Sequence, residues 1–401
     1  MRTEVKGPLR GTAAGAIAEN VIGACVHCGM CNGACPTFRL TGDELDGPRG
    51  RIYLVKQALE GEPVTALTRH HLDRCLECRA CETACPSGVD YHRLLDIGRG
   101  AVAEAAPRPL PERRLRWAVR FAASQPRLLG VLFATGGLAR AVMPKGLSFK
   151  PPPRTKPGPW PQGRQTRRMV ILGGCVQAAA APRFNAATAR VFDKIGISLT
   201  ERAGCCGAVP FHLEAGKPAR AIARRQIDAF VQALDSGVEA ILVNASGCAA
   251  FVRDWPDLFC DEPPYLEKAR RVAAHLKDPI EVLRDADLAP RRAPAARRIA
   301  VHDPCTVKNG PGLAGQVEAL LARLGFEPTT IADDGQCCGS AGTYSLFQPE
   351  FAQRLRVAKL TALNAGQPQQ IVTGNVGCWM HLGAASAIPV RHWIEAVDEV
   401  L

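Results

Sequence analysis

The sequence lacks a long uninterrupted run of apolar residues near its N-terminus, so no secretory signal peptide is predicted. The uncharged stretch at 128–139 (LLGVLFATGGLA) has twelve residues, well short of the about 20 that a membrane-spanning helix needs. We therefore expect a cytoplasmic protein. In such a protein, the 17 cysteines are more often metal ligands or redox groups than disulfides.

Acidic side chains are almost missing from one segment. Between residues 107 and 168 there are fourteen Lys or Arg residues and a single acid, Glu112. This basic segment has a net charge of +13, whereas the whole chain has a net charge of +12. The rest of the chain is close to neutral, which argues against a broad nucleic-acid-binding face. Such a segment is suited to an acidic partner or to an anionic lipid surface.

Cysteines are abundant in two similar stretches that begin 50 residues apart. CVHCGMCNGACP and CLECRACETACP share the spacing C-x2-C-x2-C-x3-C-P, which is typical of paired bacterial [4Fe–4S] clusters. Two such clusters would carry electrons one at a time. A zinc site needs only four thiolates and has no use for the third C-x2-C step, so zinc and disulfides are disfavoured.

The spacing also predicts which cysteines share a cluster. Three cysteines spaced three apart can wrap three iron corners, whereas the fourth lies too far along the chain and ligates the other cluster. One predicted cluster is held by Cys25, Cys28, Cys31 and Cys85, and the other by Cys35, Cys75, Cys78 and Cys81. Pro36 and Pro86 then turn the chain away from each site.

A chain of 401 residues is expected to contain two or three domains. Both cysteine stretches lie in residues 12–105, where helical patterns at 50–60 and 65–74 favour an α-helical ferredoxin-like domain. Residues 106–165 form a connecting region. It holds a basic helical part and a linker with seven prolines in 144–163.

The helical part of the connecting region is predicted as two helices, 112–123 and 127–142. Two interpretations of the second helix remain open. It can be a core helix between domains, or it can lie in a membrane interface, which would make the protein peripheral on the cytoplasmic face of the inner membrane.

The remaining sequence is an internal repeat, with copies at 166–290 and 297–401 offset by about 130 residues. Each copy opens with an apolar strand that ends near a cysteine, continues through a helix to a Cys-Cys-Gly, and ends with another helix, strand and Gly-Cys. Alternating strands and helices predict α/β domains with parallel sheets. Cysteines just past the strand ends should gather in the crevice where such sheets carry their sites.

The repeat cysteines form a second constellation. The first copy supplies Cys175, Cys205, Cys206 and Cys248, and the second copy supplies Cys305, Cys337, Cys338 and Cys378. An additional iron–sulfur cluster, a redox dithiol or merely buried structural cysteines are compatible with this pattern. The second copy is the favoured site, because His302, Asp303 and His381 accompany its cysteines, whereas Phe251 follows the last cysteine of the first copy.

A literal G-x-G-x-x-G occurs at 310–315, with Asp333 further on. The preceding strand ends near Cys305, so these glycines do not form the immediate strand-to-helix turn that a dinucleotide site requires. The first copy has no equivalent glycines. Dinucleotide binding is therefore disfavoured. No flavin site is evident either, nor is a set of bases suited to a small hydroxy acid, so we expect no catalytic residues for an organic substrate in this chain.

The motifs ACVHCGMCNGACPT, GDELDGPRGRIYL, HLDRCLECRACETACPSGV, AGCCGAV, CCGSAGTY and VRHWIE together resemble the iron–sulfur subunits of bacterial glycolate oxidase (glycolate dehydrogenase). The resemblance covers essentially the whole chain. It implies a complex in which two FAD-type subunits oxidise glycolate to glyoxylate and this chain passes the electrons toward a quinone. The resemblance also implies that the eight N-terminal cysteines ligate the clusters.

Related architectures leave alternatives open. A similar architecture occurs in lactate-utilisation proteins, in the iron–sulfur subunit of anaerobic glycerol-3-phosphate dehydrogenase and in heterodisulfide reductase subunits, and the stretch GDELDGPRG distinguishes the glycolate oxidase family from them best. The heterodisulfide reductase relatives use a C…CC…C-x-x-C pattern, in which the last cysteine corresponds to Phe251 or His381 here. The alternative functions are thus a subunit of another 2-hydroxy-acid or glycerol-3-phosphate dehydrogenase, or a stand-alone thiol/disulfide reductase that uses Cys337 and Cys338.

Overall fold

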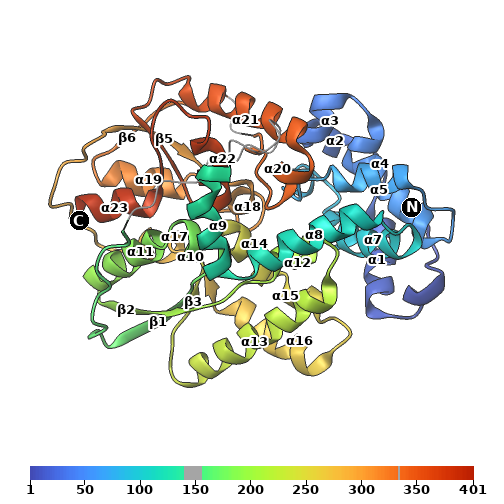
Figure 1. Cartoon of the computed structure of the whole chain (residues 1–401), viewed down its shortest axis with the longest axis horizontal. Helices are drawn as coiled ribbons and strands as arrows, with labels where there is room; N and C mark the ends of the chain where they lie inside the picture. Colours follow the sequence, from blue (N-terminus) through green and yellow to red (C-terminus); the bar gives the residue numbers. More distant parts are fainter. Residues whose placement is uncertain (140–155, 333–334) are drawn as a thin grey trace.

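The computed structural model describes residues 1–139, 156–332 and 335–401 (Figure 1). The end of the expected helix 127–142, most of the Pro-rich linker 144–163 and Asp333 lie outside the described residues. The described parts form an N-terminal helical domain, at the right in Figure 1, and two α/β units that make up the rest of the molecule. The two chain termini lie at opposite ends of the long axis.

The N-terminal domain is built only from helices in the described residues up to 139. Its elements are α1 (Ala13–Ala24), α2 (Met30–Ala34), α3 (Pro36–Thr41), α4 (Pro48–Leu59), α5 (Ala66–Asp73), α6 (Ala80–Thr83) and α7 (Tyr91–Ala105), with 3₁₀ turns η1 (Gly7–Leu9) and η2 (Glu44–Asp46). The expected helices at 50–60 and 65–74 are present as α4 and α5.

Local signals explain these helices. Thr12 caps α1 by accepting a hydrogen bond from Gly15 N, and prolines occupy the first turns of α3 and α4, where no amide donor is required. Helices α4 and α7 pack closely at Gly98, where a Cβ atom would lie 2.4 Å from Val55 Cγ2. The resulting small core holds the two cysteine loops, one between α1 and α2 and the other between α5 and α6.

The connecting region continues as α8 (Leu110–Ala123) and α9 (Pro126–Ala139). Arg116 of α8 lies over the Phe347 ring, 4.7 Å from its centroid, and Phe133 of α9 packs on a cluster that contains Phe184 and Trp379. The inner faces of both helices are therefore part of the core between domains. No helix in the described part of the chain is long and apolar enough to cross a membrane.

Each repeat copy forms a four-stranded parallel sheet. The first has the order β2-β1-β3-β4 and the second the order β6-β5-β7-β8, so the two copies share one topology. The first copy contains β1 (Arg167–Leu172), β2 (Ile197–Arg202), β3 (Ile241–Leu242), β4 (Leu276–Lys277), α10 (Cys175–Ala180), α11 (Arg183–Lys194), α12 (Ala208–His212), α13 (Gly216–Asp235), α14 (Ser246–Arg253), α15 (Trp255–Leu258), α16 (Pro263–Ala274) and α17 (Ile280–Leu283).

The second copy repeats this order. It contains β5 (Arg298–His302), β6 (Glu327–Pro328), β7 (Gln370–Thr373), β8 (Val390–His392), α18 (Cys305–Lys308), α19 (Gln316–Arg323), α20 (Tyr344–Phe347), α21 (Pro349–Asn364), α22 (Val376–Gly383) and α23 (Trp393–Val400). The helical ferredoxin-like region followed by two α/β domains with parallel sheets confirms the predicted fold class.

The strand order explains why cysteines meet. From β1 the chain goes to β2 on one side and then to β3 on the other, so the strand order reverses at β1, which is where open parallel sheets bind ligands. Cys175, the Cys205–Cys206 pair and Cys248 follow β1, β2 and β3. The second sheet places its cysteines in the same way after β5, β6 and β7.

The two repeat units share one interface. Helices α11 and α23 pack together in a core that includes Ile171 from the first sheet and Val301 from the second. Polar contacts continue the interface at the cysteine end, where Ser246 Oγ accepts hydrogen bonds from Thr306 Oγ1 at 2.8 Å and from Asn375 Nδ2 at 3.0 Å. This fixes the two cysteine sets relative to one another.

Candidate metal centres

The two N-terminal cysteine loops have the same backbone conformation. His27 and Gly29 flank Cys28 with φ of 61° and 82°, and Glu77 and Arg79 flank Cys78 with φ of 55° and 58°. Left-handed backbone at non-glycine residues costs free energy and is concentrated at functional sites. Its repetition at equivalent positions indicates that both loops are shaped for the same kind of ligand.

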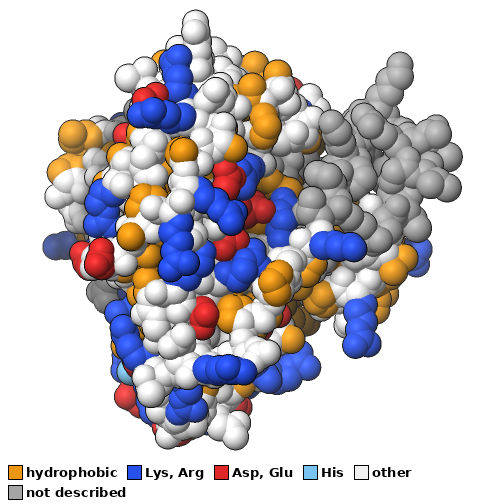
Figure 2. Space-filling view, turned by 90° about the vertical axis from the view of Figure 1, so that its left-hand side faces the viewer, with side chains coloured by type: hydrophobic (Ala, Val, Ile, Leu, Met, Phe, Trp, Pro, Cys, Tyr) orange, Lys and Arg blue, Asp and Glu red, His pale blue; other side chains and the backbone are white. Residues whose placement is uncertain are grey.

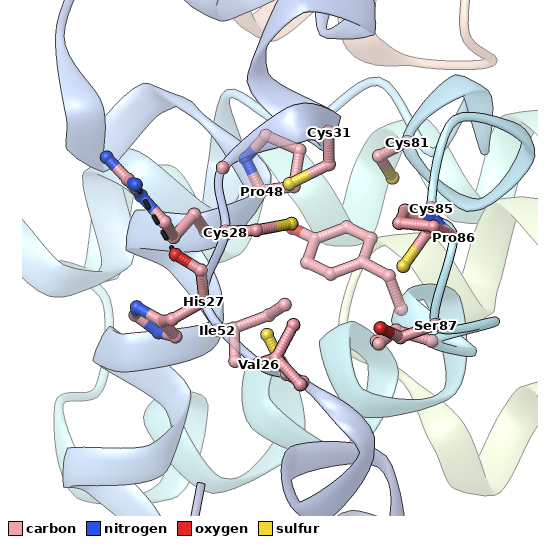
Figure 3. Close-up of a pocket in the computed structure, with 15 residues that line it drawn as sticks. Val26, His27, Cys28, Cys31, Pro48, Ile52, Cys81, Cys85, Pro86 and Ser87 are labelled. Carbon is pink, nitrogen blue, oxygen red and sulfur yellow. Dashed lines mark hydrogen bonds between the residues drawn. The ribbon is translucent and has the colours of Figure 1, made fainter.

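Cysteines from both loops line each of two neighbouring cavities. The first cavity is lined by Cys25, Cys28, Cys31 and Cys85, and the second by Cys35, Cys75 and Cys78, while Cys81 lines both. Figure 3 shows the Cys28 and Cys31 side chains on one side of the first cavity and Cys81 and Cys85 on the other. The fourth cysteine of each stretch thus faces the other stretch, as cross-ligation requires.

The N-terminal cysteines lie close enough to change one another's pKa. Burial, then the neighbouring Cys25, raises the pKa of Cys31 to about 11, and Cys85 and Cys28 add to the increase. Burial also raises the pKa of Cys81 well above its usual value, with contributions from Cys78 and Cys75. Thiols so crowded ionise together only if a cation compensates their charge, so the donor set fits a metal cluster. All 17 cysteines are free thiols in the described structure.

The stretch GDELDGPRGR contributes Pro48 and Arg51 to the lining of the second cavity and takes part in a buried ionic network beside it. Asp46 is fully buried and contacts His71 Nδ1 at 2.9 Å and Arg74 Nη1 at 2.7 Å. Arg51, equally buried, donates hydrogen bonds to Thr37 Oγ1 at 3.1 Å and to Cys35 Sγ at 3.9 Å. Such outer groups orient metal ligands and stabilise their negative charge.

Sequence reasoning used this stretch only as a family signature and missed the roles of Asp46 and Arg51. It also missed Tyr91, whose hydroxyl donates to Cys75 Sγ at 3.8 Å, and Arg99, which donates to the Cys75 carbonyl at 3.1 Å. Nothing in the linear order of the chain indicated that Asp46 and Arg51 would be buried beside cysteines.

The second repeat copy brings its four cysteines together. Sγ atoms of Cys305 and Cys337 are 4.0 Å apart, and those of Cys338 and Cys378 are 3.1 Å apart. Hydrogen bonds from Cys305 and Cys338 hold the pKa of Cys337 well below its usual range. His302 lies with Cys338 and Cys378, their ligand atoms being within 4.8 Å of one another.

His302 is suited to metal binding in its neutral form. Its Nδ1 lies 2.9 Å from Thr373 Oγ1, which fixes the ring, and burial holds its pKa well below the usual value. The other two polar residues expected around this set are differently placed. Asp303 Oδ2 accepts a hydrogen bond from Gly315 N at 2.7 Å, and His381 Nε2 lies 3.2 Å from the Ala352 carbonyl oxygen. Of the three, His302 alone groups with the thiols as a possible metal ligand.

The first repeat copy also gathers its cysteines, as the position of each one after a strand predicted, although the sequence favoured the second copy as the cluster site. Hydrogen bonds from Cys175 and Cys206 lower the pKa of Cys205 to about 4. Hydrogen bonds with Cys205 and with Cys248, and then burial, raise the pKa of Cys206 well above its usual value. Phe251, at the position of the missing cysteine, packs against Phe211, with ring centroids 5.2 Å apart. The first set is therefore assembled but closed on this side by aromatic rings.

Position distinguishes the two repeat sets. Cys78 of the second N-terminal cavity and Cys337 of the second repeat belong to one buried cluster, and burial, then the nearby Cys337, raises the pKa of Cys78 well above its usual value. Asn309 Nδ2 donates to the Cys78 carbonyl at 2.8 Å, and the Tyr344 hydroxyl donates to the Arg74 carbonyl at 3.2 Å. The second repeat set thus lies directly against the N-terminal domain.

The G-x-G-x-x-G segment lies in the loop between α18 and α19 rather than directly after a strand. Its last glycine donates its amide to Asp303, so this amide is already satisfied within the protein. Asp333, the acidic residue that a dinucleotide site would need, lies outside the described residues. The segment therefore does not form the strand-to-helix turn that a dinucleotide site requires.

Comparisons with known proteins support this organisation. Residues 22–89 match a 4Fe-4S dicluster domain, and residues 169–253 and 299–383 each match a cysteine-rich domain. The glycolate oxidase iron-sulfur subunit of Escherichia coli (strain K12) is 47% identical over 100% of this chain and 99% of its own length. A probable glycolate oxidase iron-sulfur subunit of Bacillus subtilis (strain 168) is 30% identical over 89% of this chain and 87% of its own length.

A more distant relative covers only part of the chain. Lactate utilization protein A of Bacillus velezensis is 26% identical over 49% of this chain and 82% of its own length. The similarity to the first two relatives thus extends over nearly all of this chain, including the N-terminal domain and both repeats.

Proposed function

Because the chain belongs to the family of glycolate oxidase iron–sulfur subunits, we propose that it carries electrons from a flavin subunit that oxidises glycolate to glyoxylate toward a quinone. The observation that supports this most directly is the pair of neighbouring cavities, each lined by cysteines from both N-terminal loops. A [4Fe–4S] cluster accepts and releases one electron at a time, which links a two-electron oxidation to one-electron steps.

The proposed ligand sets follow the cavities. Cys25, Cys28, Cys31 and Cys85 hold one cluster, and Cys35, Cys75, Cys78 and Cys81 hold the other. Around the second set, Arg51 and Arg99 place positive charge near Cys35 and Cys75. This charge favours the reduced, more negative state of the site, and their burial keeps water from screening it.

Exposure suggests where electrons enter. Cys28 is the one exposed thiol of the eight N-terminal cysteines, and the apolar side chains of Val26 and Met30 beside it are also exposed. The second cavity is more enclosed, since Cys35, Cys78 and Cys81 are buried. We infer that the two FAD-type subunits contact the first cavity and that the second cavity relays electrons inward.

The second repeat is the proposed site of a third cluster. Its donors are Cys305, Cys337, Cys338 and Cys378, with His302 as a neutral neighbour, and Cys337 lies against Cys78 of the second cavity. The first repeat set is the less favoured site, because no comparable contact with the N-terminal cysteines accompanies it in the described structure. A stand-alone thiol reductase is disfavoured, since Cys337 is 3% exposed and out of reach of a bulky substrate.

The experiment is to express the chain with its flavin subunits and purify the complex without oxygen. We expect glycolate to reduce the flavin and then to bleach the visible absorbance of the iron–sulfur chain and produce its electron paramagnetic resonance signals. The isolated chain should not respond to glycolate. Reduced flavin together with clusters that stay oxidised would contradict the proposal. Reduction of a small disulfide by the isolated chain would instead favour the thiol reductase.

A further inference from the structure

Helix α8 has one face that no part of the described protein covers. Leu110, Trp117 and Phe121 recur along a single side of this helix and are 63%, 53% and 48% exposed. The Trp117 and Phe121 rings stack on each other, with centroids 5.4 Å apart, while Arg116 and Ala123 on the opposite side are buried. Large aromatic side chains so placed are typical of a binding surface.

Helix α9 continues this surface. Leu128, Val131 and Leu132 are exposed on its outer side, whereas Phe133 packs inward on the repeat core. Figure 1 shows α8 and α9 following one another across the near face of the molecule. We call the outer side of both helices the α8–α9 face. Its members are Leu110, Trp117, Phe121, Leu128, Val131 and Leu132.

The charges around the α8–α9 face are of one sign. Arg113, Arg114 and Arg127 are exposed beside it. The one acidic residue of the two helices is Glu112, whose Oε1 is already bound by Arg108 Nη1 at 2.7 Å and by Arg116 Nε at 3.0 Å. On the side of the molecule that Figure 2 shows, by contrast, Lys and Arg side chains are mixed with Asp and Glu. The exposed charges on α8 and α9 beside the apolar face are thus positive.

We propose that the α8–α9 face docks on an anionic lipid bilayer, with its aromatic and aliphatic side chains in the interface and its arginines against the headgroups. Exposed apolar side chains bordered by unopposed arginines match a surface that is negative outside and apolar beneath. An acidic protein surface would pair with the arginines but would need matching apolar pockets. The inference rests on the proposed function, in which a quinone in the membrane accepts the electrons.

The first measurement is sedimentation of the holo-protein with vesicles of phosphatidylcholine containing a quarter phosphatidylglycerol. We expect binding that weakens as salt rises from about 0.1 M to about 1 M, because the Debye length falls from about 10 Å to about 3 Å. Vesicles of phosphatidylcholine alone should bind much less. Binding that is equal for both lipids, or absent at low salt, would overturn the proposal.

Two variants distinguish the effect of the arginines beside the α8–α9 face from the effect of net charge. Replacing Arg113, Arg114 and Arg127 by Gln should weaken partitioning onto the anionic vesicles by roughly 100-fold. Each arginine near an anionic surface strengthens binding by about fivefold, and three are removed. The matched control replaces Lys217, Arg225 and Arg270, which are exposed on α13 and α16, and removes the same charge elsewhere. The control variant should keep most of the binding. Equal losses in both variants would mean that net charge, not this face, is responsible, and would overturn the proposal.

Tryptophan fluorescence tests insertion directly. Trp255, Trp379 and Trp393 are buried and Trp160 donates to the Leu199 carbonyl, so Trp117 is the best-placed reporter on the α8–α9 face. We expect a blue shift on adding anionic vesicles, and its disappearance in Trp117→Phe, which should still sediment with them. An unchanged shift in that variant would overturn the proposed orientation.

Two further outcomes separate this inference from the proposed function. If the triple arginine variant binds vesicles normally but no longer assembles with the flavin subunits, the face binds an acidic protein and the lipid proposal is wrong. If vesicle binding fails while glycolate still reduces the clusters in the purified complex, docking is wrong and electron transfer stands. Loss of glycolate-driven reduction with normal vesicle binding would contradict the electron-transfer function alone.

Discussion

Cys35 and Cys85 each line a cavity with cysteines from the other stretch. Cys35→Ser should therefore remove the cluster of the second cavity and leave that of the first, with loss of about half the iron. The reason is that Cys35 faces Cys75 and Cys78 rather than its sequence neighbours. Iron analysis and electron paramagnetic resonance of the reduced protein measure this.

The matched control is Cys85→Ser, which should have the opposite effect and spare the second cavity. Cys28→Ser provides the reference spectrum for loss of the first cluster. A Cys35→Ser spectrum identical to that of Cys28→Ser would show that each stretch ligates its own cluster, contrary to the proposed arrangement.

Asp278 is a buried carboxyl whose ionisation opposes folding. Burial raises its pKa from 3.8 to about 7, although its Oδ1 accepts a hydrogen bond from Ile280 N at 3.1 Å. Between about pH 4 and about pH 7, the unfolded chain has lost this proton while the folded chain keeps it. The folded state then binds more protons, so stability falls as pH rises through this window and stays low above it.

Asp278→Asn keeps an oxygen acceptor and removes this cost. Above about pH 7 we expect urea unfolding to give a free energy of unfolding that is higher than that of the wild type by at most about 4 kcal/mol. This gain should shrink as the pH is lowered toward about pH 5. The exposed Asp287→Asn serves as control and should show little pH dependence. A gain independent of pH would exclude ionisation of Asp278 as its cause.

At the scale of elements, helix α7 contains two glycines in very different surroundings. A Cβ at Gly98 would lie 2.4 Å from Val55 Cγ2 of α4, whereas a Cβ at Gly100 would meet no atom within 4 Å. Gly98→Ala should destabilise the N-terminal domain by roughly 1–3 kcal/mol through overpacking. Gly100→Ala, its control, should stabilise it by about 0.5–1 kcal/mol, because alanine favours the helix. Urea unfolding would measure both, and equal effects would contradict the close α4–α7 packing.

The two Cys-Cys-Gly loops form similar sites with different neighbours. Changing both Cys337 and Cys338 to Ser should stop electron flow from glycolate to a quinone analogue, because this loop lies against Cys78. Dye reduction by the flavin subunits should continue, since that step comes earlier. The matching change at Cys205 and Cys206 should cost stability more than turnover. Wild-type turnover in the first variant, with both N-terminal clusters loaded, would show that the repeat site is structural.

At the scale of the whole molecule, Arg108 joins three parts of the chain. It is buried and binds Asp73 of the N-terminal domain at 2.7 Å, Glu112 of α8 at 2.7 Å, and Glu214 of the first repeat. Removing one partner from a buried ionic network leaves charges without compensation, which costs about 3–5 kcal/mol. This residue therefore couples the folding of the N-terminal domain to that of the repeats.

Arg108→Gln should lower the thermal midpoint and separate one unfolding transition into two, observed by calorimetry and by loss of cluster absorbance. The exposed Arg225→Gln of α13 is the control and should leave a single transition. A single, unshifted transition in Arg108→Gln would mean that other contacts hold the domains together. Arg79 with Asp254, and Arg93 with Asp257 at 2.8 Å, would then be the next pairs to replace.

Much of the fold was predictable because its signals are local. The C-x2-C-x2-C-x3-C-P spacing reflects the geometry of one loop, and α4, α5 and α8 appeared where helical periodicity indicated them. The repeat was equally readable, since a parallel sheet places each cysteine just after its own strand. These features need only neighbours in the sequence, so the order of residues was sufficient to identify them.

Tertiary contacts decided the rest, because they join residues far apart in the chain. Packing turned His381 and Asp303 to backbone groups, buried Asp46 and Arg51 beside the second cavity, and assembled the first repeat set as fully as the second. It also placed Cys337 against Cys78, more than two hundred positions away in the sequence, and left the outer side of α8 exposed among the described residues. Which side chains meet, and which remain exposed, depends on how elements cross in space, and residue spacing does not encode that crossing.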